Sequence, residues 1–259
     1  SLDSDLVKRM ALSLRKSGLK MLTGARVREI IRKDDGELAV IVETGKGEQQ
    51  ISAEKVLVAS GRRPLTDGLG LDSAGVKYDA KGISVDEKMG TNIPGIFAIG
   101  DVTGRYMWAH AASAAGLVAA ENAMGGELAM DFSAVPGCIY TTPEVASVGL
   151  TEQQAADAGK SVKVSRFNFA ANGKAVSMNE PDGLVKIVAA AEDGKVLGMH
   201  IMGPHASDLI MEGVVAIKNK LTAGQLAQSI HPHPSLAEAV MECAHGIDGD
   251  MIHQIKLKR

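Results

Sequence analysis

Two histidines and a glutamate near the end of the sequence are of the types that carry acid–base chemistry. The run His231-Pro232-His233-Pro234 precedes a predicted helix at residues 235–245, and Glu238 lies in its first turn. A helix N-terminus disfavours a charged imidazole and a nearby carboxylate restores it, which is how a general base is tuned. We therefore predict His233 as a proton acceptor oriented by Glu238. Ser235 and Glu238 equally fit an S-x-x-E capping box, so a purely structural role for Glu238 is the alternative.

A carboxylate in the middle of the sequence has the surroundings of a polyol-binding group. Asp101 ends the apolar run 95–100, which predicts a buried strand, and Gly100 allows close approach of backbone. Met107-Trp108-Ala109-His110 then opens a predicted Ala-rich helix at residues 110–124, whose first N–H groups suit partial negative charge on a heterocycle. The competing interpretations are that Asp101 caps the next element and that His110 is a satisfied core or cap histidine.

The C-terminal histidines and a cysteine also spell a metal-like pattern, H-x-H…C-x-H. It comprises His231, His233, Cys243 and His245. The second pair lies on a predicted helix with an offset of two residues, so its side chains point to different faces. We therefore expect no metal site.

Apolar runs and turn residues predict the elements that position these groups. A helix from Ser4 to Gly18 opens the chain, with Ser4 and Asp5 as candidate caps. An Asp34-Asp35-Gly36 turn suggests a hairpin. The strands expected in the first hundred residues are Lys20–Leu22, Ala25–Arg32, Leu38–Glu43, Lys55–Ala59 and Gly95–Asp101.

Beyond Pro136-Gly137 short strands alternate with helices, and Glu192-Asp193-Gly194 joins one strand pair. This pattern predicts an α+β arrangement with an antiparallel sheet. Breaks near Pro64 and Val135 divide the chain into residues 1–63, 64–133 and 134–259. The expected strands are 144–148, 162–167, 184–189 and 195–201, and the helices are 152–158, 207–219 and 235–245.

Composition excludes several classes of protein. The chain of 259 residues carries 28 Lys and Arg against 31 Asp and Glu, so it has no electrostatic footprint for nucleic acid or an anionic membrane. No run approaches 18 apolar residues, so we expect no membrane span. Cys138 and Cys243 lie far apart in the sequence and are expected to be reduced thiols, as in the cytoplasm. Ser1 in place of Met suggests a chain that was processed or cut from a longer one.

These motifs, in this order, resemble the flavin-dependent pyridine nucleotide–disulfide oxidoreductases from about Leu6 to Gly249. The family's T-x-x-P-x-[IVF]-[FY]-A-x-G-D motif stands at 91–101, and its M-L-A-H stretch at 107–110 with Trp108 replacing Leu. The run 140–149 is similar to the start of its dimerisation domain. The H-x-H-P-[TS]-L-x-E form at 231–238 is typical of members that oxidise dihydrolipoamide.

The resemblance implies a fold and roles for single residues. Residues 1–63 would be the C-terminal half of an NAD-binding domain with an α/β fold, 64–133 part of the central FAD-binding domain, and 134–259 an α+β dimerisation domain. Asp101, preceded by Gly100, would bind the ribityl chain of FAD, and the backbone of 107–110 would face the flavin. The positions expected to border the NAD site are Gly61 and Val27.

The resemblance also implies partners. His233 would accept a proton from the dithiol substrate, with Glu238 orienting it, in the active site of the other subunit of a homodimer. The expected partners are the lipoyl domains of 2-oxo acid dehydrogenase or glycine cleavage complexes, and the expected cofactors are FAD and NAD.

The sequence departs from the family pattern in a large part. It holds no C-x-x-x-x-C and no G-x-G-x-x-G, and Gly68 and Gly70 only begin a G-x-G, because position 73 is Ser. We therefore expect a portion of a dihydrolipoamide-oxidising enzyme that is inactive alone. The alternatives are a non-catalytic dimerisation module, or a fragment of a flavoenzyme like glutathione or mercuric reductase.

Overall fold

The computed structural model describes residues 2–254 and divides into two units. One unit joins the first fourteen residues to the stretch from Pro64 onward, and the other is Arg15–Arg63. The expected division into three domains stays a prediction.

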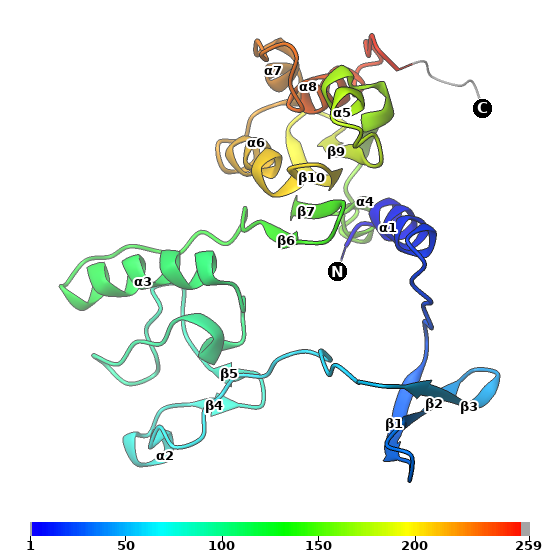
Figure 1. The fold of residues 1–259 in the computed structure, drawn as a ribbon. Coiled ribbons are helices and arrows are strands. Elements are labelled where there is room, and N and C mark those ends of the chain that lie inside the picture. The colour runs from blue at the N-terminus through cyan, green and yellow to red at the C-terminus, as the bar shows by residue number, and fades with distance from the viewer. Residues whose placement is uncertain (1, 255–259) are drawn as a thin grey trace. The chain divides into compact units, whose positions relative to one another are not determined.

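A five-stranded antiparallel sheet organises the larger unit (Figure 1). Its strand order is β6-β7-β10-β9-β8, and every neighbouring pair is antiparallel. The α+β arrangement predicted for this part of the chain is confirmed. The strands are β6 (Gly137–Ile139), β7 (Glu144–Gly149), β8 (Val162–Asn168), β9 (Leu184–Ala190) and β10 (Val196–Gly203).

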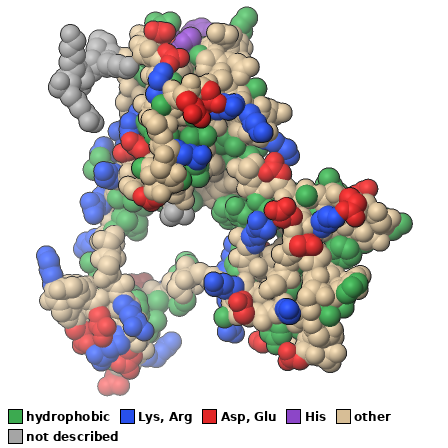
Figure 2. Space-filling view, turned by 180° about the vertical axis from the view of Figure 1, so that it is seen from behind, with side chains coloured by type: hydrophobic (Ala, Val, Ile, Leu, Met, Phe, Trp, Pro, Cys, Tyr) green, Lys and Arg blue, Asp and Glu red, His purple; other side chains and the backbone are tan. Residues whose placement is uncertain are grey.

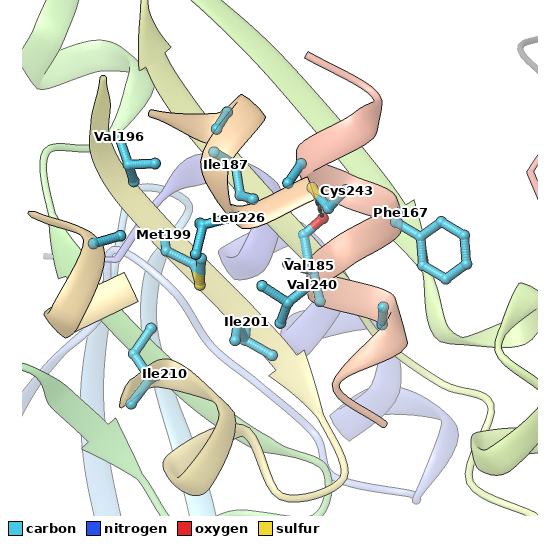
Figure 3. Packing of buried hydrophobic residues seen from close by; sticks show 14 of the residues in the cluster. Phe167, Val185, Ile187, Val196, Met199, Ile201, Ile210, Leu226, Val240 and Cys243 are labelled. Carbon is cyan, nitrogen blue, oxygen red and sulfur yellow. Dashed lines mark hydrogen bonds between the residues drawn. The ribbon is translucent and has the colours of Figure 1, made fainter. Parts of the chain in front are cut away.

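Helices near the C-terminal end cover one face of this sheet. α6 (Ala206–Lys218) packs on β7 and β10, and α8 (Glu238–His245) packs on β8 and β9. Figure 3 shows Val240 and Cys243 of α8 among side chains of the sheet. The buried residues of this core are at most 9% exposed to solvent. The other short helices of this part are α4 (Glu152–Asp157), η2 (Phe169–Ala171), α5 (Gly173–Ser177) and α7 (Ala223–Gln228).

The opposite face of the sheet carries the N-terminal helix α1 (Ser4–Lys16). Leu6 is fully buried against Val145, Leu184 and Met202, which alternate along their strands with residues of the helical core. The expected caps Ser4 and Asp5 are wrong. Asp3 caps α1, because its Oδ1 accepts the N–H of Asp5 at 3.0 Å.

The unit Arg15–Arg63 holds a three-stranded antiparallel sheet, β1 (Arg26–Arg32), β2 (Leu38–Thr44) and β3 (Gly47–Ala53). The hairpin around Asp35 is confirmed. The strands expected at 20–22 and 55–59 are wrong: Leu57 is 91% exposed and Val58 is 73% exposed. An apolar run forms a buried strand only where neighbouring strands satisfy its backbone, and none pairs with these runs in the described residues.

The segment that leads to Asp101 is also not a regular strand. This segment follows β4 (Tyr78–Asp79) and β5 (Gly82–Ile83) and runs into η1 (Gly100–Thr103). Of its residues 95–101, only Phe97 takes part in strand pairing, in a single bridge with Gly90. Ile99 remains 39% exposed. The predicted buried strand is therefore wrong for the same reason, since no further strand pairs with it in the part of the chain that the structure describes. The helices of this segment are α2 (Leu71–Ala74) and α3 (Ala109–Ala123).

The surface is mixed in character. Figure 2 shows acidic and basic side chains interspersed on the face in view. Among the described residues, no helix is both long and apolar enough to pass through a membrane.

Candidate active site

The structure brings His233 and Glu238 into contact at the loop before α8. Nδ1 of His233 lies 2.9 Å from Oε1 of Glu238. A carboxylate only accepts, so Nδ1–H donates and the lone pair of the neutral ring lies on Nε2. The His233 side chain is 80% exposed, and its Nε2 has no hydrogen-bond partner within the described residues. This arrangement presents a proton-accepting nitrogen to solvent.

Glu238 has a second contact that fixes its carboxylate. Its Oε2 accepts the backbone N–H of Ser235 at 2.8 Å. Burial alone would raise the pKa of Glu238, but the hydrogen bonds from Ser235 and His233 outweigh it and lower the pKa. Glu238 is therefore ionised at neutral pH, and its carboxylate holds the ring of His233 in one tautomer.

The capping box is only half formed, and Glu238 contacts both His233 and the backbone before α8. Glu238 accepts the Ser235 N–H as a capping box requires, but the buried Ser235 hydroxyl has no partner in the described part of the chain. α8 begins at Glu238 and not at Ser235, because Ala239 N–H bonds to Leu236 O in a tighter preceding turn. One carboxylate thus both orients a histidine and steadies a helix start.

His231 forms a second histidine–glutamate pair that the sequence did not predict. Its Nε2 lies 3.0 Å from Oε2 of Glu212 on α6, and its Nδ1 lies 2.8 Å from Ser229 O. The ring is 8% exposed, so both nitrogens are used inside the protein. The one signal for this pair in the sequence is that Glu212 is a charged residue within the largely apolar helix α6.

The segment around Asp101 brings the second group of predicted residues together. Asp101 is exposed on η1, which packs against α3. Gly100 has a positive φ of 71°, and a Cβ there would lie 3.3 Å from the Cβ of Ala112 on α3. Glycine therefore permits the close approach of the two elements.

The start of α3 combines backbone donors with a tethered histidine. Trp108 is its N-cap and supplies no side-chain cap, and Met107 directly precedes it. Ala109 and His110 begin the helix, whose first N–H groups lack intrahelical partners. His110 Nε2 lies 2.8 Å from Pro136 O, the satisfied role expected as its alternative.

Trp108 packs closely against the first strand of the sheet. A Cβ at Gly137 of β6 would lie 3.0 Å from Cη2 of Trp108. The indole also lies 5.3 Å, centroid to centroid, from the ring of Tyr106. The indole thus packs the start of α3 on β6, and His110 contacts the residue just before that strand.

The two remaining predicted site residues lie in the unit Arg15–Arg63. Val27 is on β1 and 57% exposed, and Gly61 is exposed in the stretch after β3 with a φ of 123°. That unit contains none of the other predicted site residues.

The metal-like pattern is not assembled. Cys243 is fully buried in the core, and its Sγ lies 3.3 Å from Val185 O. Burial raises the pKa of the Cys243 thiol to about 12, so it stays protonated. The described residues contain no group of three or more side chains suited to a metal ion.

Two family models match most of the chain. The model for the pyridine nucleotide-disulphide oxidoreductases matches residues 1–116, and the model for the dimerisation domain of the same family matches residues 135–244. The chain belongs to the pyridine nucleotide-disulphide oxidoreductase family.

The chain is similar to dihydrolipoyl dehydrogenases of several bacteria. The chain is 44% identical to dihydrolipoyl dehydrogenase of Thermus scotoductus over 97% of its length and 55% of the relative's. It is also 44% identical to dihydrolipoyl dehydrogenase of Mycobacterium leprae, over 97% of its length and 54% of the relative's. The chain spans about half the length of the curated relatives it matches.

Solved structures show the same fold. LpdA from Mycobacterium tuberculosis has a TM-score of 0.85 at 28% identity, over 95% of this chain and 53% of that one. The HOCl-induced flavoprotein disulfide reductase RclA from Escherichia coli has a TM-score of 0.85 at 26% identity, over 95% of this chain and 56% of that one.

Proposed function

We propose that this chain is a portion of a dihydrolipoyl dehydrogenase and carries the proton acceptor for the dithiol substrate. The intact protein would oxidise protein-bound dihydrolipoamide to lipoamide and reduce NAD. One observation carries the proposal: His233 Nδ1 lies 2.9 Å from an ionised Glu238, and its Nε2 is open to solvent. The names of the relatives support it.

The proposed chemistry of His233 is a proton transfer. Nε2 accepts the proton of a substrate thiol, which makes the sulfur a nucleophile. The resulting imidazolium lies next to Glu238, whose charge stabilises it. The thiolate would attack a redox disulfide, and this chain's two cysteines, Cys138 and Cys243, are not spaced to form the C-x-x-x-x-C of that disulfide.

The residues around Asp101 fit part of a flavin site. An exposed carboxylate suits a sugar-like polyol, and the open N–H groups at the start of α3 suit the partial negative charge of a heterocycle. Asp101 and the backbone of 107–110 would hold FAD, with Gly100 allowing the approach, and Gly61 and Val27 would border NAD. FAD, when bound, supplies the two-electron relay to NAD. A preparation of this chain alone is expected to show little flavin absorbance, because these contacts are a small share of a dinucleotide site.

We further propose a homodimer, with His233 and Glu238 serving the active site of the partner subunit. The match to a dimerisation domain supports it, as do exposed apolar residues on and after α6: Met211, Val215 and Ile230. Lipoyl domains of 2-oxo acid dehydrogenase or glycine cleavage complexes are the proposed partners, and the cytoplasm is the proposed location.

The experiment joins this chain to the N-terminal half of the Thermus scotoductus relative. The chimera is expected to bind flavin and to reduce NAD with dihydrolipoamide, whereas the chain alone does neither. The matched control is the H233Q chimera, which is expected to bind flavin without comparable turnover.

A flavin-loaded chimera with no dithiol activity would contradict the proposal and favour the non-catalytic dimerisation module. Turnover with glutathione disulfide or mercuric ion in place of lipoamide would favour the reductase alternative. Activity of the isolated chain would contradict the expectation that it is incomplete.

A further inference from the structure

A lysine is fully buried in the middle of the dimerisation sheet. Lys186 is 0% exposed on β9, between Val185 and Ile187, which point into the helical core. Strand alternation places Lys186 on the other face, where α1 lies. Its cross-strand neighbours on that face are His200 of β10 and Arg166 of β8. A lysine is almost never fully buried unless it is paired.

Three carboxylates surround the ammonium group. Nζ of Lys186 lies 2.8 Å from Oδ1 of Asp3, 2.7 Å from Oδ2 of Asp5 and 2.7 Å from Oε2 of Glu152. Arg166 adds a second cation, 2.8 Å from Asp5 and 2.7 Å from Glu152. All three hydrogens that the ammonium can donate thus have an acceptor.

The contacts of Lys186 and Asp3 favour the charged forms of both side chains. Burial alone would lower the pKa of Lys186, but hydrogen bonds to Asp3, Asp5 and Glu152 outweigh it and raise the pKa. Burial would raise the pKa of Asp3, and the same contact outweighs it and lowers that pKa. His200 stays neutral, because burial lowers its pKa. The two directions favour the charged forms of Lys186 and Asp3, which lie 2.8 Å apart.

The ions join two parts of the chain that belong to different family models. Asp3 and Asp5 lie at the start of α1 within residues 1–116, whereas Lys186 and Glu152 lie within residues 135–244. Asp3 has two further roles here, since it caps α1 and its Oδ2 accepts the N–H of Glu152 at 3.4 Å. Leu6, one turn along α1, adds the apolar part of the same contact.

We propose that Lys186 is an intramolecular docking site that fixes α1, the first helix of residues 1–116, onto the five-stranded sheet. The occupant of this site is the Asp3–Asp5 segment of the same chain. The docking is selective because α1 must offer two carboxylates spaced to meet one ammonium. Breaking such a pair leaves a buried charge uncompensated, so the effect of removing one partner is large.

Hydrogen exchange of the whole chain tests the proposal. K186M removes the charge and keeps an unbranched side chain, and it is expected to lower the protection of α1 amides by about 10²–10³-fold. Amides of β10 are expected to keep their protection. The matched control is R9M, which removes an ion pair between α1 and Asp182 that is about one-third exposed. R9M is expected to lower α1 protection by less than about fivefold.

A double-mutant cycle separates docking from general stability. D3N alone is expected to lower α1 protection less than K186M, and D3N combined with K186M to lower it less than the sum of the two. Unchanged α1 protection in K186M, an equal loss in β10, or additive effects would each overturn the proposal. If K186M does not fold, a loss in D3N confined to α1 supports the docking, and a loss spread over the sheet contradicts it.

Discussion

His231 and His233 lie two residues apart on one loop, and each contacts a glutamate. The two histidine–glutamate pairs differ in burial and in how many ring nitrogens are bonded. His231 is buried, and both of its nitrogens are held, by Glu212 and by Ser229 O. His233 is exposed, with one nitrogen held by Glu238 and the other open. A general base needs an oriented ring and a free lone pair. The same two residue types thus make a structural tie in one place and a candidate catalytic pair in the other.

The largest expected effect follows from removing the open nitrogen. In the flavin-loaded chimera, H233Q is expected to slow the dithiol half-reaction by about 10²–10⁴-fold, the usual share of a general base. Stopped-flow reduction of the flavin by dihydrolipoamide measures it. Flavin content and thermal stability of the same preparation serve as controls, and an H233Q variant that merely unfolds would favour the capping role of this loop.

A smaller effect is expected for the orienting carboxylate. E238Q removes the charge that favours imidazolium, and one amide oxygen cannot serve both His233 and the Ser235 N–H. We expect a slowing of about 10–10²-fold, again in the dithiol half-reaction. The double variant H233Q/E238Q is expected to be no slower than H233Q alone, since the pair acts as a unit. Fully additive losses would argue for two separate roles.

The buried pair is expected to affect stability rather than rate. H231Q leaves the half-buried Glu212 without its imidazole partner, which costs about 1–3 kcal/mol of unfolding free energy. Denaturant unfolding of the chain measures this cost, and the dithiol rate of the chimera is expected to stay within about threefold. A larger rate loss in H231Q than in H233Q would reverse the assignment of the two histidines.

The smallest expected effect is a pH dependence of stability. Burial raises the pKa of Glu212 above its usual 4.5, although the contact with His231 opposes the shift. A raised pKa means that the folded protein binds the proton more tightly than the unfolded chain, so stability is lost as pH rises from about 4.5 through the folded value. E212Q removes this titration, so the Tm of E212Q minus the Tm of the parent chain is expected to rise by about 2–4 °C from pH 4.5 upward. A constant gap would show that folding leaves the pKa of Glu212 unchanged.

The sequence predicted the dimerisation sheet well because its pattern is local. Four of its strands and the helices α4 and α6 were expected within one or two residues of their observed bounds, and the Asp193-Gly194 turn pairs β9 with β10 as expected. The strands at 55–59 and 95–101 were wrong because an apolar run specifies burial, whereas a strand also needs a neighbour to pair with.

The candidate site was predictable where spacing decides the geometry and not where burial does. Glu238 follows His233 by five residues across a turn, so their contact could be expected. Glu212 meets His231 from a helix nineteen residues upstream, and Lys186 meets Asp3 across most of the chain. Those contacts depend on tertiary packing, and only a charged residue within an apolar element hinted at them.

The close packing of Trp108 on Gly137 has a spectroscopic consequence. Trp108 is the chain's single tryptophan, so the intrinsic indole fluorescence of the protein comes from one position at the start of α3. Any separation of α3 from β6 would bring water to that ring and shift its emission to longer wavelength. The junction between these two elements therefore carries its own optical probe, readable without a label.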